Sequence, residues 1–284
     1  MSYPLPDARL AAMLAEDAPH GDLTTAGLGI GERPGRLVLR ARDTMTLACI
    51  EEAERLFQLA ACAETRRYAA SGAQVEAGGE LLRAAGPAAA LHRAAKVAQV
   101  LVEIASGIAS RAHAMVQAAR SARPGIAVAC TRKHLPGAKD VMLRAIAAGG
   151  CIPHRLGLSD SVLVFPEHRA FLGRTPPHLW VASLRAAQPE RKIAVEADSI
   201  DLALQFAHAG VDTLQLDKLP PEDVGAVARA LSGMARRPLL VATGGVNAAN
   251  AAAYAAAGAD LLVTSAPYAA PPADVAVTMS AVDR

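Results

Sequence analysis

Apolar residues follow two different patterns along the chain, one in its first hundred residues and another after residue 125. In the first part, short apolar stretches such as 36–40 (R-L-V-L-R) surround one helical segment near 49–60, and a short amphipathic helix is expected at 5–16. The segment 17–25 (D-A-P-H-G-D-L-T-T) is expected to be a loop in which Asp22 and two threonines bond backbone amides. This part lacks a strand–helix repeat, so we predict an α+β region.

A long helical pattern follows, from about residue 87 to residue 122. Ala, Val, Leu and Ile recur there at helical spacing, and Gly107 is expected to break the helix. After this stretch the pattern changes to strands that alternate with helices, so the stretch is our candidate junction between two domains.

Beyond residue 125, near-continuous apolar stretches alternate with helical segments. The expected strands are 126–130, 161–165, 192–196, 213–217, 239–245 and 260–265, and the expected helices are 141–148, 176–188, 199–208, 221–231 and 247–257. Repeated β-α units of this kind predict a parallel sheet covered by helices. We favour a closed or nearly closed barrel because polar residues end so many successive strands; an open, doubly wound sheet is the alternative.

Composition narrows the classes of function. The 284 residues carry a net charge of +2, so no global charge bias points to nucleic acid or to an anionic membrane. The four cysteines show neither C-x-x-C pairing nor metal-ligand spacing, which favours reduced, buried thiols. The first residues lack a secretory pattern, and charged residues such as Glu103 and Asp260 interrupt the apolar stretches. We therefore expect a cytoplasmic protein without membrane insertion.

Polar residues stand at the ends of the expected strands, which in a parallel barrel all meet at one face. They are Arg132, Lys133, His154, Arg155, Glu196, Asp217, Thr243, Gly244, Gly245 and Ser265. Arg and Lys bind phosphates and carboxylates, although most such residues are only solvated surface charges. His154 is either a structural histidine or a cation that switches near neutral pH.

The later strand ends carry acids and a glycine turn. Glu196 and Asp217 suit a hydrated Mg²⁺, and each acid taken alone is more often a capping or solvated residue. The segment 243–247 (T-G-G-V-N) is expected to lead directly into a helix, where backbone amides and the helix dipole accept a phosphate. Together these parts predict a pocket for a phosphorylated sugar that carries pyrophosphate.

Several motifs then match one family. They are H-G-D-L-T-T at 20–25, S-G-I-A at 106–109, T-R-K at 131–133, H-R-L-G-L-S-D at 154–160, V-E at 195–196, L-D at 216–217 and G-G-V at 244–246. In these motifs the chain resembles the quinolinate phosphoribosyltransferases (nicotinate-nucleotide pyrophosphorylases, carboxylating). The resemblance implies an α/β fold: an N-terminal α/β sandwich followed by an incomplete (β/α) barrel, in a homodimer, or a higher oligomer, with a shared active site.

The resemblance also implies a division of the chain and roles for its residues. We expect the sandwich at 1–101, the barrel at 102–268 and a C-terminal segment, 269–284, that packs back on the sandwich. The substrate-binding residues implied are Lys96, Arg132, Lys133, His154, Arg155, Thr243, Gly244, Gly245 and Ser265. Glu196 and Asp217 would face the ribose and Mg²⁺ and act in catalysis. Lys133 is the third catalytic residue that the resemblance implies. The implied reaction transfers phosphoribose from phosphoribosyl pyrophosphate (PRPP) to a ring nitrogen of an acidic aromatic acceptor.

Departures from the family pattern lie on the acceptor side. Lys96 stands where the family has arginine, and Phe165 stands where it has a lysine. Other features, such as C-I-P-H-R-L-G-L-S at 151–159 and V-L-V-F-P-E-H at 162–168, are similar to the ModD subgroup, which is associated with molybdate transport. Two alternatives stay open: a true quinolinate phosphoribosyltransferase, and a non-catalytic protein that binds phosphate or molybdate.

Overall fold

The computed structural model describes residues 4–282 and divides the chain into two compact units. One, here called the N-terminal unit, comprises the residues up to 113, residues 134–150 and the residues from 267 on; the other, the barrel unit, comprises residues 114–133 and 151–266. Helix α4 (Ala88–Ala122) runs without interruption through residues 101 and 102, where the sequence suggested a boundary, and the division falls later in this helix.

The N-terminal unit contains an antiparallel sheet in the order β13-β1-β5-β3. Its strands are β1 (Pro34–Ala41), β3 (Glu64–Arg67), β5 (Glu80–Pro87) and β13 (Val275–Ala281), and a short ribbon pairs β2 (Met45–Thr46) with β4 (Gln74–Val75). Burial alternates along β1, where Leu37 and Leu39 are fully buried and Arg36 and Arg40 are exposed. One face of the sheet therefore packs on a core and the other meets solvent.

Four helices complete this unit, together with the first part of α4. They are α1 (Asp7–Asp17), α2 (Leu23–Gly27), α3 (Ile50–Leu59) and α5 (Lys139–Ala148). The prediction of a loop over residues 17–25 is wrong from residue 23 on, where α2 begins. Asp22 accepts hydrogen bonds from the amides of Thr24 (3.0 Å) and Thr25 (3.1 Å) and so caps this helix.

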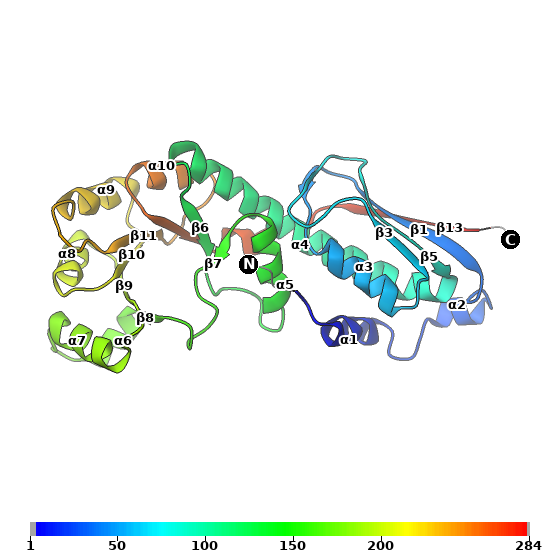
Figure 1. The fold of residues 1–284 in the computed structure, drawn as a ribbon, viewed down its shortest axis with the longest axis horizontal. Coiled ribbons are helices and arrows are strands. Elements are labelled where there is room, and N and C mark those ends of the chain that lie inside the picture. Colours follow the sequence, from blue (N-terminus) through cyan, green and yellow to red (C-terminus); the bar gives the residue numbers. More distant parts are fainter. Residues whose placement is uncertain (1–3, 283–284) are drawn as a thin grey trace. The chain divides into compact units, whose positions relative to one another are not determined.

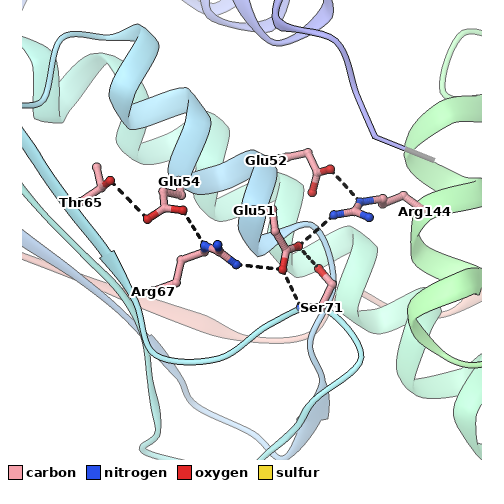
Figure 2. A network of polar contacts seen from close by, with 7 residues as sticks. All are labelled: Glu51, Glu52, Glu54, Thr65, Arg67, Ser71 and Arg144. Atoms are coloured by element: carbon pink, nitrogen blue, oxygen red, sulfur yellow. Dashed lines mark hydrogen bonds and ion pairs between the residues drawn. The ribbon is translucent and has the colours of Figure 1, made fainter. Parts of the chain in front are cut away.

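A polar network joins α3 to α5 (Figure 2). Arg144 of α5 donates to Glu52 (2.7 Å) and to Glu51 (3.0 Å) of α3, and Arg67 of β3 donates to Glu51 (3.0 Å) and Glu54 (2.5 Å). The Glu52 side chain is 5% exposed and that of Arg144 is 16% exposed. This pair is therefore nearly removed from water, unlike the surface ion pairs of the unit.

Helix α4 is not broken at Gly107, and the expected interruption is wrong. A Cβ atom at this position would lie 2.1 Å from the carbonyl oxygen of Pro271. The glycine therefore permits the C-terminal segment to pass close to the helix. One position earlier, the hydroxyl of Ser106 accepts a hydrogen bond from the amide of Ala48 (3.0 Å).

The barrel unit is built on a curled parallel sheet that forms a half-barrel, so the predicted α/β fold with an incomplete barrel is confirmed (Figure 1). Its strand order is β7-β6-β12-β11-β10-β9-β8. The strands are β6 (Ala127–Cys130), β7 (Ile152–Pro153), β8 (Val162–Val164), β9 (Ile193–Ala197), β10 (Thr213–Asp217), β11 (Leu239–Thr243) and β12 (Leu261–Thr264). Ala129, Val241 and Val263 from β6, β11 and β12 form a core cluster in this sheet.

Helices follow the strands along the chain and pack on the sheet. They are α6 (Pro166–Ala170), α7 (Pro177–Ala187), α8 (Ile200–His208), α9 (Pro221–Ala230) and α10 (Ala251–Ala256), followed by the 3₁₀ turn η1 (Ala266–Ala269). Helices α8, α9 and α10 pack on the central strands (Figure 1). Strand β7 and helix α6 were not expected from the sequence, and the other elements of this unit lie close to the predicted ranges.

Two further expectations concern the cysteines and the membrane. All four cysteines are free and buried, as predicted. Across residues 4–282, the helices are too short or too polar to span a lipid bilayer.

Candidate active site

A cavity of about 710 Å³, here called the polar cavity, opens at the carboxyl ends of the half-barrel strands. Each strand of the sheet contributes lining residues at or just beyond its end, from Thr131 after β6 to Thr264 in β12. Of the predicted site residues, those that line it are Arg132, Lys133, His154, Arg155, Glu196, Asp217, Thr243, Gly244, Gly245 and Ser265. Parallel strands deliver their ends to one face, which explains how residues far apart in sequence meet here.

Lys96 belongs to the N-terminal unit. It lies on α4, where its ammonium donates to the side-chain oxygen of Gln99 (2.8 Å). Its role toward a substrate stays a prediction.

Three cations of the polar cavity are not neutralised by acids. Within residues 4–282, Arg132, Lys133 and Arg155 form no ion pair. Burial and the nearby charge of Arg132 lower the pKa of Arg155 from its ordinary value. Fixed positive charges that lie together without partners favour binding of a multiply charged anion.

His154 lies beside this cation cluster but is not itself a fixed charge. Burial, and then the charge of Arg155, lower the pKa of His154 below its ordinary value of 6.5. The imidazole is therefore neutral near pH 7 in the free protein, and a bound anion would favour its protonated form.

The guanidinium of Arg155 contacts the aromatic ring of Phe165 and not an acidic side chain. The guanidinium carbon lies 5.2 Å from the centroid of the Phe165 ring, within the range of a cation–π interaction. The same ring stacks on His168 at a centroid distance of 5.9 Å, and His168 Nδ1 accepts the amide hydrogen of Phe165 (3.0 Å). Arg155 is therefore packed on a fixed surface while its guanidinium hydrogens stay available to a ligand.

Two carboxylates, Glu196 from β9 and Asp217 from β10, also line the polar cavity. Burial has the largest effect on the pKa of Glu196 and raises it, and the negative charge of Asp217 raises it further. The side-chain amide of Gln215 donates a hydrogen bond to Glu196 (2.7 Å), which lowers this pKa. Lys218 lies 3.4 Å from Asp217. Gln215, Glu167 and Lys218 line the cavity and were missed as site residues. The signal for Gln215 was an amide within the otherwise apolar strand T-L-Q-L-D.

Glu196 and Asp217 are carboxylates of the kind that proteins use to bind Mg²⁺. No group of three or more His, Cys, Asp or Glu residues that could hold a metal occurs in the described part of the chain. Mg²⁺ is generally held by one or two carboxylates, waters and substrate phosphates, so Glu196 and Asp217 fit this ion when a phosphorylated substrate is bound.

The glycine turn after β11 approaches Asp217 closely. Gly244 and Gly245 have φ angles of 79° and 89°, and a Cβ atom at Gly244 would lie 2.6 Å from the Asp217 carboxylate. The side-chain amides of Asn247 and Asn250 both donate to the Gly245 carbonyl (3.1 Å each). Helix α10 begins only at Ala251, so the expectation that the turn leads directly into a helix is wrong.

No activated thiol lies beside the cation cluster. Cys130 directly precedes Thr131, and a hydrogen bond with Cys151 together with burial raises the pKa of Cys130 far above its ordinary value. A thiol in this state is not a nucleophile at neutral pH.

Comparison with known proteins places the chain in a family. The family models described as the quinolinate phosphoribosyl transferase N-terminal and C-terminal domains match residues 22–106 and 108–278. The chain belongs to the quinolinate phosphoribosyl transferase family. Members of this family are phosphoribosyltransferases, so the predicted family and enzyme class are confirmed.

Relatives within the family carry two kinds of name. A ModD protein of Rhodobacter capsulatus, provisionally named a pyrophosphorylase, is 51% identical over 87% of this chain and 94% of its own. The human carboxylating nicotinate-nucleotide pyrophosphorylase is 32% identical over 87% of this chain and 83% of its own. Among solved structures, NadC from Streptococcus pyogenes superposes with a TM-score of 0.89 at 25% identity, covering 98% of this chain and 97% of its own.

Proposed function

We propose that the protein is a ModD-like phosphoribosyltransferase that transfers phosphoribose from PRPP to a nitrogen of an acidic aromatic acceptor and releases pyrophosphate. The observation that carries this proposal is the grouping of three unpaired cations, two carboxylates and a glycine turn in the polar cavity. PRPP carries a 5-phosphate and a pyrophosphate on opposite sides of a ribose, and therefore needs several separate anion contacts.

The donor would be held from both ends. The glycine turn at Gly244 and Gly245 exposes backbone amides for the 5-phosphate, while Arg132 and Lys133 supply charge for the pyrophosphate. Glu196 and Asp217 would face the ribose between them. Mg²⁺, when bound with PRPP, would supply additional positive charge against the leaving pyrophosphate.

The reaction is a displacement at the anomeric carbon of the ribose. The acceptor nitrogen donates its electron pair to this carbon as the bond to pyrophosphate breaks, and pyrophosphate leaves with the bonding pair. Positive charge that develops on the sugar would be stabilised by the carboxylates of Glu196 and Asp217, which are fixed before the reaction. A covalent enzyme intermediate is not needed in this scheme.

Calorimetric titration with PRPP and Mg²⁺ tests the assigned cations. We expect Arg132→Ala to weaken PRPP binding by about tenfold or more, because a charged hydrogen bond contributes about 1.5–3 kcal/mol. Arg174→Ala is the matched control, since Arg174 is exposed in the same unit and does not line the polar cavity. Unchanged affinity in Arg132→Ala would contradict the proposed donor site.

A second candidate is a true quinolinate phosphoribosyltransferase of NAD synthesis. The 32% identity to the human carboxylating enzyme favours it. Quinolinate, PRPP and Mg²⁺ are incubated with the protein, and nicotinate mononucleotide and carbon dioxide are measured. Rapid formation of both products would establish this candidate, and pyrophosphate release only with other aromatic acids would exclude it. Molybdate binding without turnover of PRPP by any acceptor would instead favour the non-catalytic alternative.

We also propose, from the resemblance to the family, that the protein is a cytoplasmic homodimer with a shared active site. Light scattering of the purified protein measures the mass, and mixing two inactive variants from different site residues tests sharing. Recovery of activity in the mixture would support a site that needs both copies.

A further inference from the structure

Lys218 lines the polar cavity in an unusual backbone conformation. It directly follows β10, and its φ is 59°, in the left-handed region that lysine rarely adopts. Its amide donates to the carbonyl of Thr243 at the end of β11 (2.9 Å). The neighbouring strand therefore holds the backbone of Lys218 in a conformation that a lysine does not favour by itself.

The ion pair of Lys218 does not explain this conformation. The ammonium nitrogen lies 3.4 Å from the Asp217 carboxylate, and the Lys218 side chain is 79% exposed. An exposed pair of this kind usually stabilises a protein by less than a left-handed residue costs. Asparagine would adopt the same conformation with less strain. Strained residues gather at functional sites, so the ammonium group itself is the feature that needs a reason.

Gly244 leaves room for the side chain of Lys218. Asp217 and Thr243 lie opposite each other at the ends of β10 and β11, so the residues that follow them, Lys218 and Gly244, are neighbours. A Cβ atom at Gly244 would lie 2.6 Å from Lys218 Cγ and 2.7 Å from the Lys218 amide nitrogen. The lysine side chain therefore begins against the glycine turn and ends beside Asp217, and both of these line the polar cavity.

We propose that Lys218 is a substrate-binding residue whose ammonium group binds the 5-phosphate of PRPP, together with backbone amides of the glycine turn. The proposal rests on the proposed function, which assigns the 5-phosphate to Gly244 and Gly245, and it adds a side-chain cation to that contact. Backbone amides offer a phosphate only partial charges, whereas an ammonium group supplies a full one. Lysine binds phosphate as a point charge on a flexible stem, which suits an exposed side chain.

The contact with Asp217 is compatible with this role. An ammonium group has three hydrogens, so it can donate to a phosphate while it stays beside the Asp217 carboxylate. Lys218 and Arg132 follow β10 and β6, and two strands, β11 and β12, lie between these in the sheet. The polar cavity therefore has a cation on each side, as a ligand with phosphates on opposite sides of a ribose requires.

Calorimetric titration with PRPP, ribose 5-phosphate and pyrophosphate, each with Mg²⁺, tests this role. Lys218→Asn removes the charge and keeps a residue that tolerates the left-handed conformation. We expect this variant to bind PRPP and ribose 5-phosphate about tenfold more weakly or worse, because a charged hydrogen bond is lost, and to bind pyrophosphate unchanged. Arg132→Ala is expected to show the opposite preference between ribose 5-phosphate and pyrophosphate.

Two further variants separate charge from structure. Lys218→Arg keeps the positive charge and is expected to retain most of the affinity for ribose 5-phosphate, because both cations bind phosphate. Lys192→Asn is the matched control, since Lys192 is exposed in the same unit and does not line the polar cavity. It is expected to bind all three ligands as the wild-type protein does. Lys218→Asn is expected to melt at or above the wild-type temperature, because asparagine relieves backbone strain.

The outcomes separate this inference from the proposed function. Unchanged affinity of Lys218→Asn for ribose 5-phosphate, or an equal loss for ribose 5-phosphate and pyrophosphate, would overturn the inference, and PRPP turnover would still support the proposed function. A loss in Lys218→Arg as large as that in Lys218→Asn would also overturn it, since positive charge would not be the cause. A wild-type protein that binds PRPP but not ribose 5-phosphate would overturn the inference alone. Failure of the wild-type protein to bind PRPP would overturn the proposed function and the inference with it.

Discussion

The backbone conformation of Gly244 affects the shape of the polar cavity directly. It has a positive φ of 79°, and an added Cβ would lie 2.6 Å from both the Asp217 carboxylate and the Lys218 side chain. We expect Gly244→Ala to lower the free energy of unfolding by about 1–3 kcal/mol, the usual cost of such a backbone conformation, and to displace Asp217. Urea unfolding and the KM for PRPP measure the two effects.

Gly245 provides the control for this prediction. It also has a positive φ, of 89°, but a Cβ built there has no atom within 4 Å. Gly245→Ala should therefore show the backbone strain without the displacement of Asp217. If both variants lose the same free energy of unfolding, the close approach of Gly244 to Asp217 adds no strain to that of the backbone.

Glu196 links the site to the pH dependence of stability. Burial and the charge of Asp217 raise its pKa above the ordinary value of 4.5, so the folded protein holds this proton more tightly than the unfolded chain. Stability from this group is complete below pH 4.5 and is lost as the pH rises through the folded pKa. We expect Glu196→Gln to remove this loss, as measured by urea unfolding at pH 4.5 and at pH 7. A wild-type protein that loses no stability relative to the variant over this range would contradict the assigned environment.

At the scale of elements, the network in Figure 2 ties α5 to α3. Arg144→Met would leave Glu52, whose side chain is 5% exposed, without its guanidinium partner. Removing one partner of a buried ion pair commonly destabilises a protein by about 3–5 kcal/mol. We expect a loss near the lower figure, because Arg144 keeps some exposure, and thermal or urea unfolding would measure it.

A second variant distinguishes lost charge balance from lost packing. The double change Arg144→Met with Glu52→Gln leaves no uncompensated charge between the helices and should recover most of the stability. Arg55→Met, at an exposed pair with Asp7, is expected to change stability little. No recovery in the double variant would show that the packing of Arg144, and not its charge, holds α5 to α3.

The elements that the sequence predicted well were those with long apolar patterns. The strands near Ile193–Ala197 and Leu239–Thr243 are near-continuous apolar stretches, and their alternation with helices is visible without a structure. Strand β7 has two residues and α6 has five, so neither extends far enough to show a period. Gly107 was misinterpreted because a glycine that breaks a helix and one that admits a neighbouring chain look the same in sequence.

The site was predictable to the extent that it lies at strand ends. One rule, that parallel strands end at the same face, was enough to group Arg132 with Asp217 and Gly244. Contacts between side chains were not predictable in this way. The packing of Arg155 on Phe165 joins segments that follow β7 and β8, which are strands at opposite ends of the sheet. The hydrogen bond from Gln215 to Glu196 depends on the register of the neighbouring strands β10 and β9, which places these two residues opposite each other.

At the scale of the whole molecule, the last strand completes a sheet that begins near the first residues. Strand β13 pairs with β1 from Gly35↔Ala281 to Ala41↔Val275. Truncation after Ala273 would remove β13 and expose the whole edge of β1. We expect this truncation to lower the melting temperature and to cause aggregation, because an unpaired, partly apolar strand edge associates with other chains.

Replacing residues within β13 supplies the control for truncation. Thr278→Ser keeps the backbone pairing and should leave the melting temperature close to that of the unchanged protein. Melting temperature and light scattering report the two effects. A truncated protein that melts as the full chain does would show that β13 contributes little to the sheet.

The pairing of β13 with β1 also has a consequence for the order of events on the ribosome. Domains generally fold as they emerge during synthesis, the N-terminal one first. Here β1 must wait for its neighbour β13 until the strands of the half-barrel have also been translated. The half-barrel, whose strands all lie between Ala127 and Thr264, is complete before that moment. The sheet that contains β1 is therefore completed after the half-barrel, although β1 is made before it.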